Sequence, residues 1–220
     1  MELRNVEKAR INMVEQQIRP WNLTDPAVLE LMSRLRREDF VPAAYKALAF
    51  ADLEIPLVAG QYMLMPRLQA RLLQDAAVRP TDKVLEIGTG SGFMTAMLAH
   101  LAQRVISLEI NPEIAALARA NLKKAGVHHC EVRHANGVGG APADAPFDVI
   151  LLGGSVLDVP QTLLNQLKPG GRLVAVIGEE PVMHATIITR TGQTHFKSVS
   201  KWDTAAPVLQ HFPKPSTFRF

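Results

Sequence analysis

The sequence predicts an α/β fold: a doubly wound, mostly parallel, seven-stranded sheet with an N-terminal helical extension and a C-terminal antiparallel hairpin. From Lys83 onward, strand-like and helix-like runs alternate, which is typical of a parallel sheet with helices on both faces. One apolar run breaks into glycines on alternate positions, Gly88, Gly90 and Gly92, as in a strand that turns under a nucleotide-like ligand. A hydrophobic content of 47% over 220 residues is enough to build one buried core.

The length suits a single domain, with residues 1–78 as a helical N-terminal segment and residues 79–220 as the ligand-binding core. The formal net charge is only +3, and the densest basic cluster is Arg34, Arg36 and Arg37. Such a short cluster is more typical of a solvated helix end than of a nucleic-acid surface. We therefore expect no nucleic-acid partner.

Cysteine content and the first residues indicate a reducing compartment. Cys130 is the only cysteine, so no internal disulfide is expected. Residues 1–8 mix charges without an apolar core, unlike a secretory signal, and no apolar run approaches the ~18 residues of a membrane span. His128, His129 and His134 surround Cys130 but match no zinc-ligand spacing. We expect a cytoplasmic protein with no membrane contact and no metal.

The N-terminal part is expected to be helical around one irregular stretch. Apolar residues at helical spacing predict a helix over residues 5–18, which Arg19-Pro20 ends. Thr24-Asp25-Pro26 begins a second helix, with a capping side chain and proline in the first turn. Residues 38–65 show no clear periodicity, and a connection of this length is usually functional. A further helix is predicted over residues 66–77.

The core elements follow from the alternation of apolar runs and helical spacing. Strands are predicted over residues 83–87, 104–109, 130–133, 147–152 and 171–177. Helices are predicted between them over residues 92–102, 111–125 and 159–167. An antiparallel hairpin at the sheet edge is expected from residues 183–190 and 194–202, with a turn at Thr191-Gly192, followed by an irregular stretch, Phe212-Pro213-Lys214-Pro215.

The loop after the first core strand carries the strongest ligand-binding signal. A dinucleotide fingerprint, G-x-G-x-x-G, would place its third glycine at Phe93, whereas here that glycine comes one residue earlier. With an acid two positions before the first glycine, E-x-G-x-G-x-G resembles the first motif of S-adenosylmethionine (AdoMet) dependent methyltransferases. This resemblance implies that the cofactor pocket is shaped by Glu86, Gly88, Thr89, Gly90, Ser91 and Gly92.

Two further strand ends carry candidate cofactor contacts. Glu109, followed by Ile110, ends the second core strand, where a carboxylate can accept hydrogen bonds from both hydroxyls of a ribose. Asn136-Gly137 follows the third core strand, and its side-chain oxygen could accept from an adenine amino group. Asn-Gly is also a common turn pair, so both interpretations of this dipeptide stay open.

Several segments together resemble one family, the protein-L-isoaspartate O-methyltransferases. They are Met13 to Ile18, Arg37 to Pro42, Tyr45 to Asp52 with Pro56-Leu57, Gly60-Gln61 with Pro66, and Val84 to Gly92. The resemblance implies a Rossmann-like class I methyltransferase fold. It also implies AdoMet as cofactor, S-adenosyl-L-homocysteine as product, and methyl transfer to a carboxylate of isoaspartyl residues in damaged proteins, a protein-repair reaction.

The chain departs from the family pattern on the acceptor side. The resemblance places Gly60, Gln61, Tyr62 and Leu64 there, but the family has a serine, the residue most tied to its catalysis, where this chain has Leu64. No catalytic residue is therefore assigned. The family usually has Asp where this chain has Asn136, although an amide keeps a carbonyl acceptor.

Three other functions remain open beside isoaspartyl methylation. Leu64 and its methionine neighbours favour a methyltransferase with a less polar acceptor, because an apolar floor disfavours a buried carboxylate. A non-catalytic AdoMet-binding module would keep the same loop. An NAD-dependent dehydrogenase fits less well because of Phe93. The sequence does not indicate an oligomeric state or a role for residues 203–220.

Overall fold

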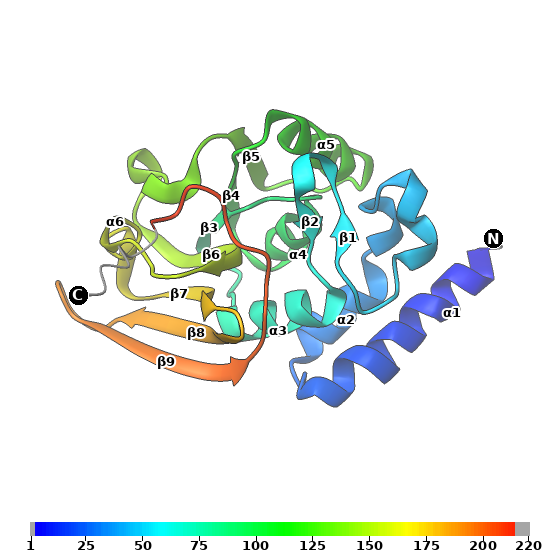
Figure 1. The fold of residues 1–220 in the computed structure, drawn as a ribbon, viewed down its shortest axis with the longest axis horizontal. Coiled ribbons are helices and arrows are strands. Elements are labelled where there is room, and N and C mark those ends of the chain that lie inside the picture. Colours follow the sequence, from blue (N-terminus) through cyan, green and yellow to red (C-terminus); the bar gives the residue numbers. More distant parts are fainter. Residues whose placement is uncertain (1–2, 214–220) are drawn as a thin grey trace.

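A seven-stranded sheet forms the centre of the computed structural model, which describes residues 3–213 (Figure 1). Its strands are β3 (Lys83–Ile87), β4 (Arg104–Glu109), β5 (Cys130–His134), β6 (Phe147–Val156), β7 (Leu167–Glu179), β8 (Val182–Arg190) and β9 (Phe196–Asp203). Their order in the sheet is β5-β4-β3-β6-β7-β8-β9. The pairs from β5 to β7 are parallel, and β8 and β9 add antiparallel pairs. The predicted fold class and the C-terminal hairpin are thus confirmed.

Side chains alternate between two cores on opposite faces of the sheet. Val84 and Val105 point into one core, and Leu85 and Ile106 into the other, because successive residues of a strand face opposite ways. The first core is covered by helices α3 (Pro66–Ala76), α4 (Phe93–Leu101) and α5 (Pro112–Lys124), and the second mainly by the short helix α6 (Gln161–Leu164) and the segment between β5 and β6.

The N-terminal helices pack on the first core. Helix α1 (Leu3–Met13) continues into a π-helical turn, Val14–Ile18, and a 3-10 turn, Arg19–Trp21, so the predicted helix changes type rather than ending at Arg19. Helix α2 (Pro26–Arg34) begins where predicted, and Asp25 caps it by accepting from two backbone N–H groups at 2.9 and 3.3 Å. Within residues 3–213 we find no helix with the length and apolarity that crossing a membrane requires.

The predicted helix over residues 159–167 is wrong in extent. Only Gln161–Leu164 is helical, and Leu167 already belongs to β7. Leu163, Leu164 and Leu167 all reach the second core, the first two from the short helix and the third from β7, so their spacing does not require one continuous helix. β6 and β7 are correspondingly longer than predicted. Of the predicted irregular end, Lys214 and Pro215 lie outside the described residues.

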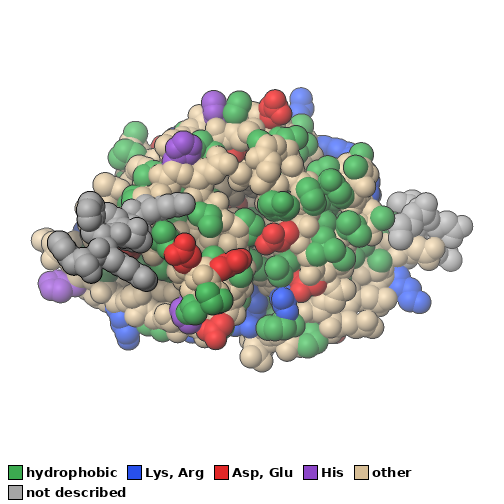
Figure 2. Space-filling model, viewed as in Figure 1, with side chains coloured by type: hydrophobic (Ala, Val, Ile, Leu, Met, Phe, Trp, Pro, Cys, Tyr) green, Lys and Arg blue, Asp and Glu red, His purple; other side chains and the backbone are tan. Residues whose placement is uncertain are grey.

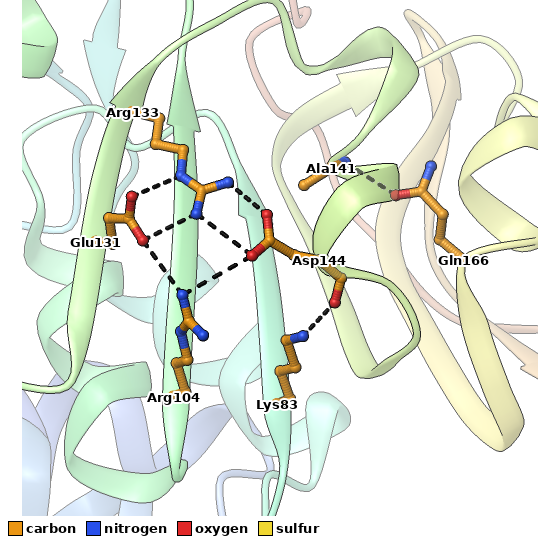
Figure 3. Close-up of polar contacts among 7 residues, drawn as sticks. All are labelled: Lys83, Arg104, Glu131, Arg133, Ala141, Asp144 and Gln166. Carbon is orange, nitrogen blue, oxygen red and sulfur yellow. Dashed lines mark hydrogen bonds and ion pairs between the residues drawn. The ribbon is translucent and has the colours of Figure 1, made fainter.

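Figure 3 shows how the segment between β5 and β6 is fixed to the sheet. Arg133 of β5 lies 2.8 Å from the Glu131 carboxylate and 2.5 Å from that of Asp144. Arg104 of β4 approaches the same two carboxylates at 3.4 and 3.8 Å. Hydrogen bonds from Arg133 are the main cause that lowers the pKa of both carboxyls. Together with the Gln166 amide, which bonds the backbone of this segment, the network holds the residues that follow β5.

Candidate active site

The candidate site lies where the strand order reverses. The chain runs from β3 outward to β4 and β5 and then returns to β6 on the other side of β3, and such a switch point is where ligands bind in open α/β sheets. The glycine loop, Gly88–Gly92, leaves β3 at this point. Gly153 of β6 lies so close to the Gly88 carbonyl that a Cβ at Gly153 would overlap it, so the glycine loop and β6 meet backbone to backbone.

The end of the glycine loop is shaped by helix packing. Gly92 has φ +86° and directly precedes α4. A Cβ at Gly92 would lie 3.3 Å from the Ala118 carbonyl of α5, so glycine allows the two helices to approach. From α5, the Asn121 amide also donates to the Ser91 carbonyl at 2.9 Å. The spacing of the glycines therefore reflects protein packing as well as any ligand.

Glu109 ends β4 beside the glycine loop. Its two carboxylate oxygens accept from the Gly90 and Asn111 N–H groups, each at 3.0 Å, and the side chain is almost fully buried. Each oxygen keeps a further lone pair, so the carboxylate can hold the loop and still accept from a ligand. Ile110, the next residue, is half-buried and uses its carbonyl to contact His134 at 3.1 Å.

Glu86 lies beneath the loop and is completely buried. One carboxylate oxygen accepts from the Thr95 hydroxyl of α4 at 2.5 Å and from the Ser107 hydroxyl of β4 at 2.6 Å. Burial is the main cause that raises its pKa to about 7; the two hydrogen bonds oppose this shift and the nearby Glu109 adds to it. The sequence placed Glu86 among residues that shape the cofactor pocket, and the structure connects it to the loop through Ser107.

Asn136 and Gly137 form the turn after β5. The Asn136 side chain accepts from the Val138 N–H at 3.1 Å and so caps a 3-10 turn, Gly137–Gly139. Gly137 packs against Ile87 so closely that a side chain there would overlap it. Both residues thus have a clear structural role, and their contact with adenine stays a prediction.

A small two-stranded hairpin carries most of the residues that were predicted to form the acceptor side. Strand β1 (Ile55–Pro56) pairs with β2 (Tyr62–Met63), and its tight turn is closed by a hydrogen bond from the Leu57 N–H to the Gln61 carbonyl at 2.8 Å. Gly60 and Gln61 lie at this turn. Past the turn, Tyr62 and Leu64 line one small cavity together with Gly88, Thr89 and Ser91, so the structure brings the two predicted halves of the site together.

Arg37 corrects an interpretation made from the sequence. Its basic cluster was expected to be a solvated helix end, and Arg34 and Arg36 are indeed exposed, but the Arg37 side chain is completely buried. Its guanidinium donates to the Leu64 carbonyl at 2.8 Å and to the Gln69 side chain, and it lies 5.1 Å from the Phe93 ring. Desolvation lowers its pKa to about 9.

Arg37 therefore joins the acceptor side to the start of α4, directly after the glycine loop. Only the family resemblance of the segment Arg37 to Pro42 could have separated Arg37 from its neighbours, because nothing in the local composition distinguishes it from Arg36.

A larger cleft of about 530 Å³ opens beside Tyr62, which also lines the small cavity. Its lining is apolar apart from three carboxylates, Glu54, Glu179 and Glu180. On the face in Figure 2, acidic side chains lie among hydrophobic ones near the middle of the molecule. Burial and the charge of Glu180 raise the pKa of Glu54. The cleft and the small cavity share Tyr62 in their linings.

The segment after β9 crosses the same end of the sheet, as the red trace in Figure 1 shows. Ser155 of β6 holds it by bonding the Ala206, Pro207 and Leu209 backbone groups at 2.8, 2.8 and 2.9 Å. Leu209 lies against Gly88. The sequence assigned this segment no role, and no local pattern indicates that it returns to the glycine loop.

Among residues 3–213, no three His, Cys, Asp or Glu side chains are grouped as metal ligands would be.

Comparison with known proteins identifies relatives over most of the chain. The family model for protein-L-isoaspartate(D-aspartate) O-methyltransferases matches residues 8–204. The protein-L-isoaspartate O-methyltransferase of Koribacter versatilis is 40% identical over 181 residues, which cover 82% of this chain and 81% of the relative. That of Methanoculleus marisnigri is 42% identical over 178 residues, 81% of each chain.

Solved structures share the fold. A putative protein-L-isoaspartate O-methyltransferase from Plasmodium falciparum, in complex with S-adenosyl-L-homocysteine, superimposes with a TM-score of 0.78 at 18% identity and covers 91% of this chain and 98% of that one. Another protein-L-isoaspartate O-methyltransferase gives 0.75 at 22% identity, over 92% of this chain and 65% of that one. On the sequence match, this chain belongs to the protein-L-isoaspartate(D-aspartate) O-methyltransferase family.

Proposed function

We propose that this chain is an AdoMet-dependent protein-L-isoaspartate O-methyltransferase that methylates the carboxylate of isoaspartyl residues in damaged proteins. The observation that carries the proposal is the cavity shared by Tyr62 and Leu64 of the acceptor side and Gly88, Thr89 and Ser91 of the glycine loop. Membership of the family and the names of its curated relatives support the same activity.

The groups around the glycine loop fit AdoMet. Each Glu109 oxygen keeps a lone pair for a ribose hydroxyl, and the surface at Gly90 is open, since a Cβ there would meet only Leu57 at 3.8 Å. When bound, AdoMet supplies a methyl group on a sulfonium sulfur for in-line displacement by a nucleophile. We propose that the cofactor contacts are drawn from residues 79–220 and comprise Glu86, Gly88, Thr89, Gly90, Ser91, Gly92, Glu109, Ile110, Asn136 and Gly137, with Glu86 acting indirectly.

The acceptor chemistry makes few demands on the chain. A carboxylate is ionised at neutral pH, so no residue has to remove a proton from it before transfer. The task of the acceptor side, within residues 1–78, is to orient the carboxylate and exclude water. Arg37 holds the Leu64 backbone for this purpose. The Leu64 side chain offers no hydroxyl, so the hydrogen bond implied by the family serine is missing at that position.

Leu64 also favours a second candidate function, the methylation of a less polar acceptor with the same cofactor. Its side chain is only 5% exposed and shares the small cavity with Met63 and Met94. A carboxylate buried among such groups without a donor is disfavoured. The large cleft beside Tyr62 nevertheless suits a polypeptide acceptor, which is why isoaspartyl proteins remain the first choice.

The test combines binding with turnover. Calorimetry with S-adenosyl-L-homocysteine should show binding, and an isoaspartyl peptide with AdoMet should yield a base-labile methyl ester, detected as volatile methanol. Binding without ester would contradict isoaspartyl methylation and favour the second candidate or a non-catalytic module. No binding at all would contradict every AdoMet-based function.

A cytosolic location is proposed as well, supported by a single cysteine, Cys130, in the chain.

A further inference from the structure

A chain of buried hydroxyls connects Glu86 to the glycine loop. The Ser107 hydroxyl donates to the Glu86 carboxylate at 2.6 Å, and the Thr89 and Ser107 hydroxyl oxygens are 2.5 Å apart. A serine hydroxyl has one proton, so Ser107 uses it on Glu86 and Thr89 must donate to Ser107. The direction of the relay is therefore Thr89 to Ser107 to Glu86. We name these three residues the Glu86 relay.

Every member of the Glu86 relay is shielded from water. Glu86 and Ser107 are completely buried, and Thr89 is 4% exposed. Thr89 lies inside the glycine loop and lines the cavity shared with the acceptor side, whereas Glu86 and Ser107 do not line it. A change at Ser107 can therefore reach a ligand on the loop only through its neighbours.

The negative charge of Glu86 is poorly compensated. Its second carboxylate oxygen is buried and has no hydrogen-bond partner among the described residues. Two titratable groups interact electrostatically with the Glu86 carboxylate: Glu109, at the end of β4, and Cys130 on β5. Neither of them carries a positive charge. A buried carboxylate without a cation is costly, so a positively charged ligand on the loop would be attracted to it.

We propose that Glu86 is a positioning residue that holds Thr89 through Ser107 and whose charge favours a sulfonium-bearing cofactor over its uncharged thioether product. The inference rests on the proposed function, because it assumes that AdoMet binds at the glycine loop. AdoMet and S-adenosyl-L-homocysteine share their amino-acid and adenosine groups and differ in the methyl group and its sulfonium charge. The ratio of their affinities therefore isolates that charge from the general integrity of the loop.

The relay is tested by calorimetry with S-adenosyl-L-homocysteine on the full chain. Ser107→Ala and Thr89→Val each break the relay, and each is expected to weaken binding by about 10-fold, the loss of one or two buried hydrogen bonds. The matched control is Thr186→Val, which removes a buried hydroxyl from β8, away from the loop. It should change affinity by no more than roughly 2-fold. Equal affinities for Ser107→Ala and Thr186→Val would overturn the relay.

The charge is tested with Glu86→Gln, which keeps an acceptor for Ser107 and Thr95 but removes the ionised form. It should weaken AdoMet about 10-fold more than S-adenosyl-L-homocysteine. In the unaltered chain, the AdoMet preference should fall as the pH drops below about 7, where Glu86 becomes protonated, and it should be flat in Glu86→Gln.

Two results are decisive against the inference or its premise. An equal loss of both ligands in Glu86→Gln, with unchanged pH dependence, would show that Glu86 is merely structural. Failure of the unaltered chain to bind S-adenosyl-L-homocysteine would contradict the proposed function itself. Thermal unfolding of each variant confirms that the fold is intact, and Thr89→Val, which leaves Glu86 with both of its donors, keeps the test available if Ser107→Ala does not fold.

Discussion

Leu64 stands where the family pattern has a serine, and we propose that it faces the acceptor carboxylate. Leu64→Ser would supply a hydroxyl to an acceptor carboxylate, and a hydrogen bond to a charged group contributes about 1.5–3 kcal/mol. If it is felt in the transition state, kcat/KM for an isoaspartyl peptide should rise by roughly 10-fold or more. Steady-state methylation measures this. Leu64→Ala is the matched control, because it opens the same space without a hydroxyl; an equal gain in both variants would contradict the orienting role of the hydroxyl.

Glu86 should make the stability of the protein depend on pH. Its pKa in the folded chain, about 7, exceeds its ordinary value of 4.5, so the folded state binds the proton more tightly than the unfolded state. Stability contributed by this group is present at low pH and is lost as the pH rises from about 4.5 to about 7. We therefore compare the free energy of unfolding of Glu86→Gln with that of the unaltered chain. Between pH ~5 and pH ~8 this difference should shift in favour of Glu86→Gln by up to about 3 kcal/mol.

Denaturant unfolding at the two pH values measures this difference. Because it is a comparison between pH values, the constant effect of replacing a carboxyl with an amide cancels. An absent difference would show that folding does not raise the pKa of Glu86, and a difference of opposite sign would show that folding lowers it.

Arg37 should contribute far more than its exposed neighbour. Arg37→Met leaves the Leu64 and Ala49 carbonyls and the Gln69 side chain without their buried donor, at a cost of about 1–3 kcal/mol for each unpaired group. Arg34→Met, in the same cluster, removes only an exposed pair with Glu30, worth about 0.5 kcal/mol. Chemical denaturation compares the two, and similar losses would contradict the buried role of Arg37.

At the scale of elements, local chemistry predicted most boundaries of the core. Asp25 caps α2 as expected, and Asn111 caps α5 at the predicted start of that helix, because Asn and Asp side chains accept from the free N–H groups of a first turn. The predicted helix at 159–167 failed because its apolar spacing also suits a short turn that packs α6 on the second core. The long connection at 38–65 contains a hairpin of two-residue strands. Strands this short are too short to show an alternation of apolar and polar residues in the sequence.

Gly92 offers a prediction about how α4 meets α5. Gly92→Ala must place a side chain at φ +86° and 3.3 Å from the Ala118 carbonyl. Gly126→Ala is a matched control, since its φ is +67° and a Cβ there meets nothing within 4 Å. The control should cost about 1 kcal/mol of backbone strain, and Gly92→Ala at least about 1 kcal/mol more.

Thermal or denaturant unfolding of the two glycine variants gives the comparison. Equal destabilisation would mean that α4 and α5 can separate without cost. A larger loss in Gly92→Ala, accompanied by weaker binding of S-adenosyl-L-homocysteine, would connect helix packing to the loop.

At the scale of the whole molecule, the site is assembled from distant segments, and this limits prediction. The glycine loop was recognised because its residues are contiguous. Three contacts join distant parts of the chain. The partners are 21 positions apart for Glu86 and Ser107, 27 for Arg37 and Leu64, and 121 for Gly88 and Leu209. Contacts of this kind depend on how the sheet and its flanking segments fold together, so no local pattern contains them.

We propose that this molecule directs a methyl group to isoaspartyl carboxylates and leaves ordinary aspartyl carboxylates unmodified. The most direct measurement is kcat/KM for two peptides of identical composition, one with isoaspartate and one with aspartate, followed by mass spectrometry of the methyl ester. We predict ester on the isoaspartyl peptide, slow for lack of a hydroxyl at Leu64, and none above background on the aspartyl peptide. Equal methylation of both peptides, or no ester on either while S-adenosyl-L-homocysteine binds, would contradict the claim.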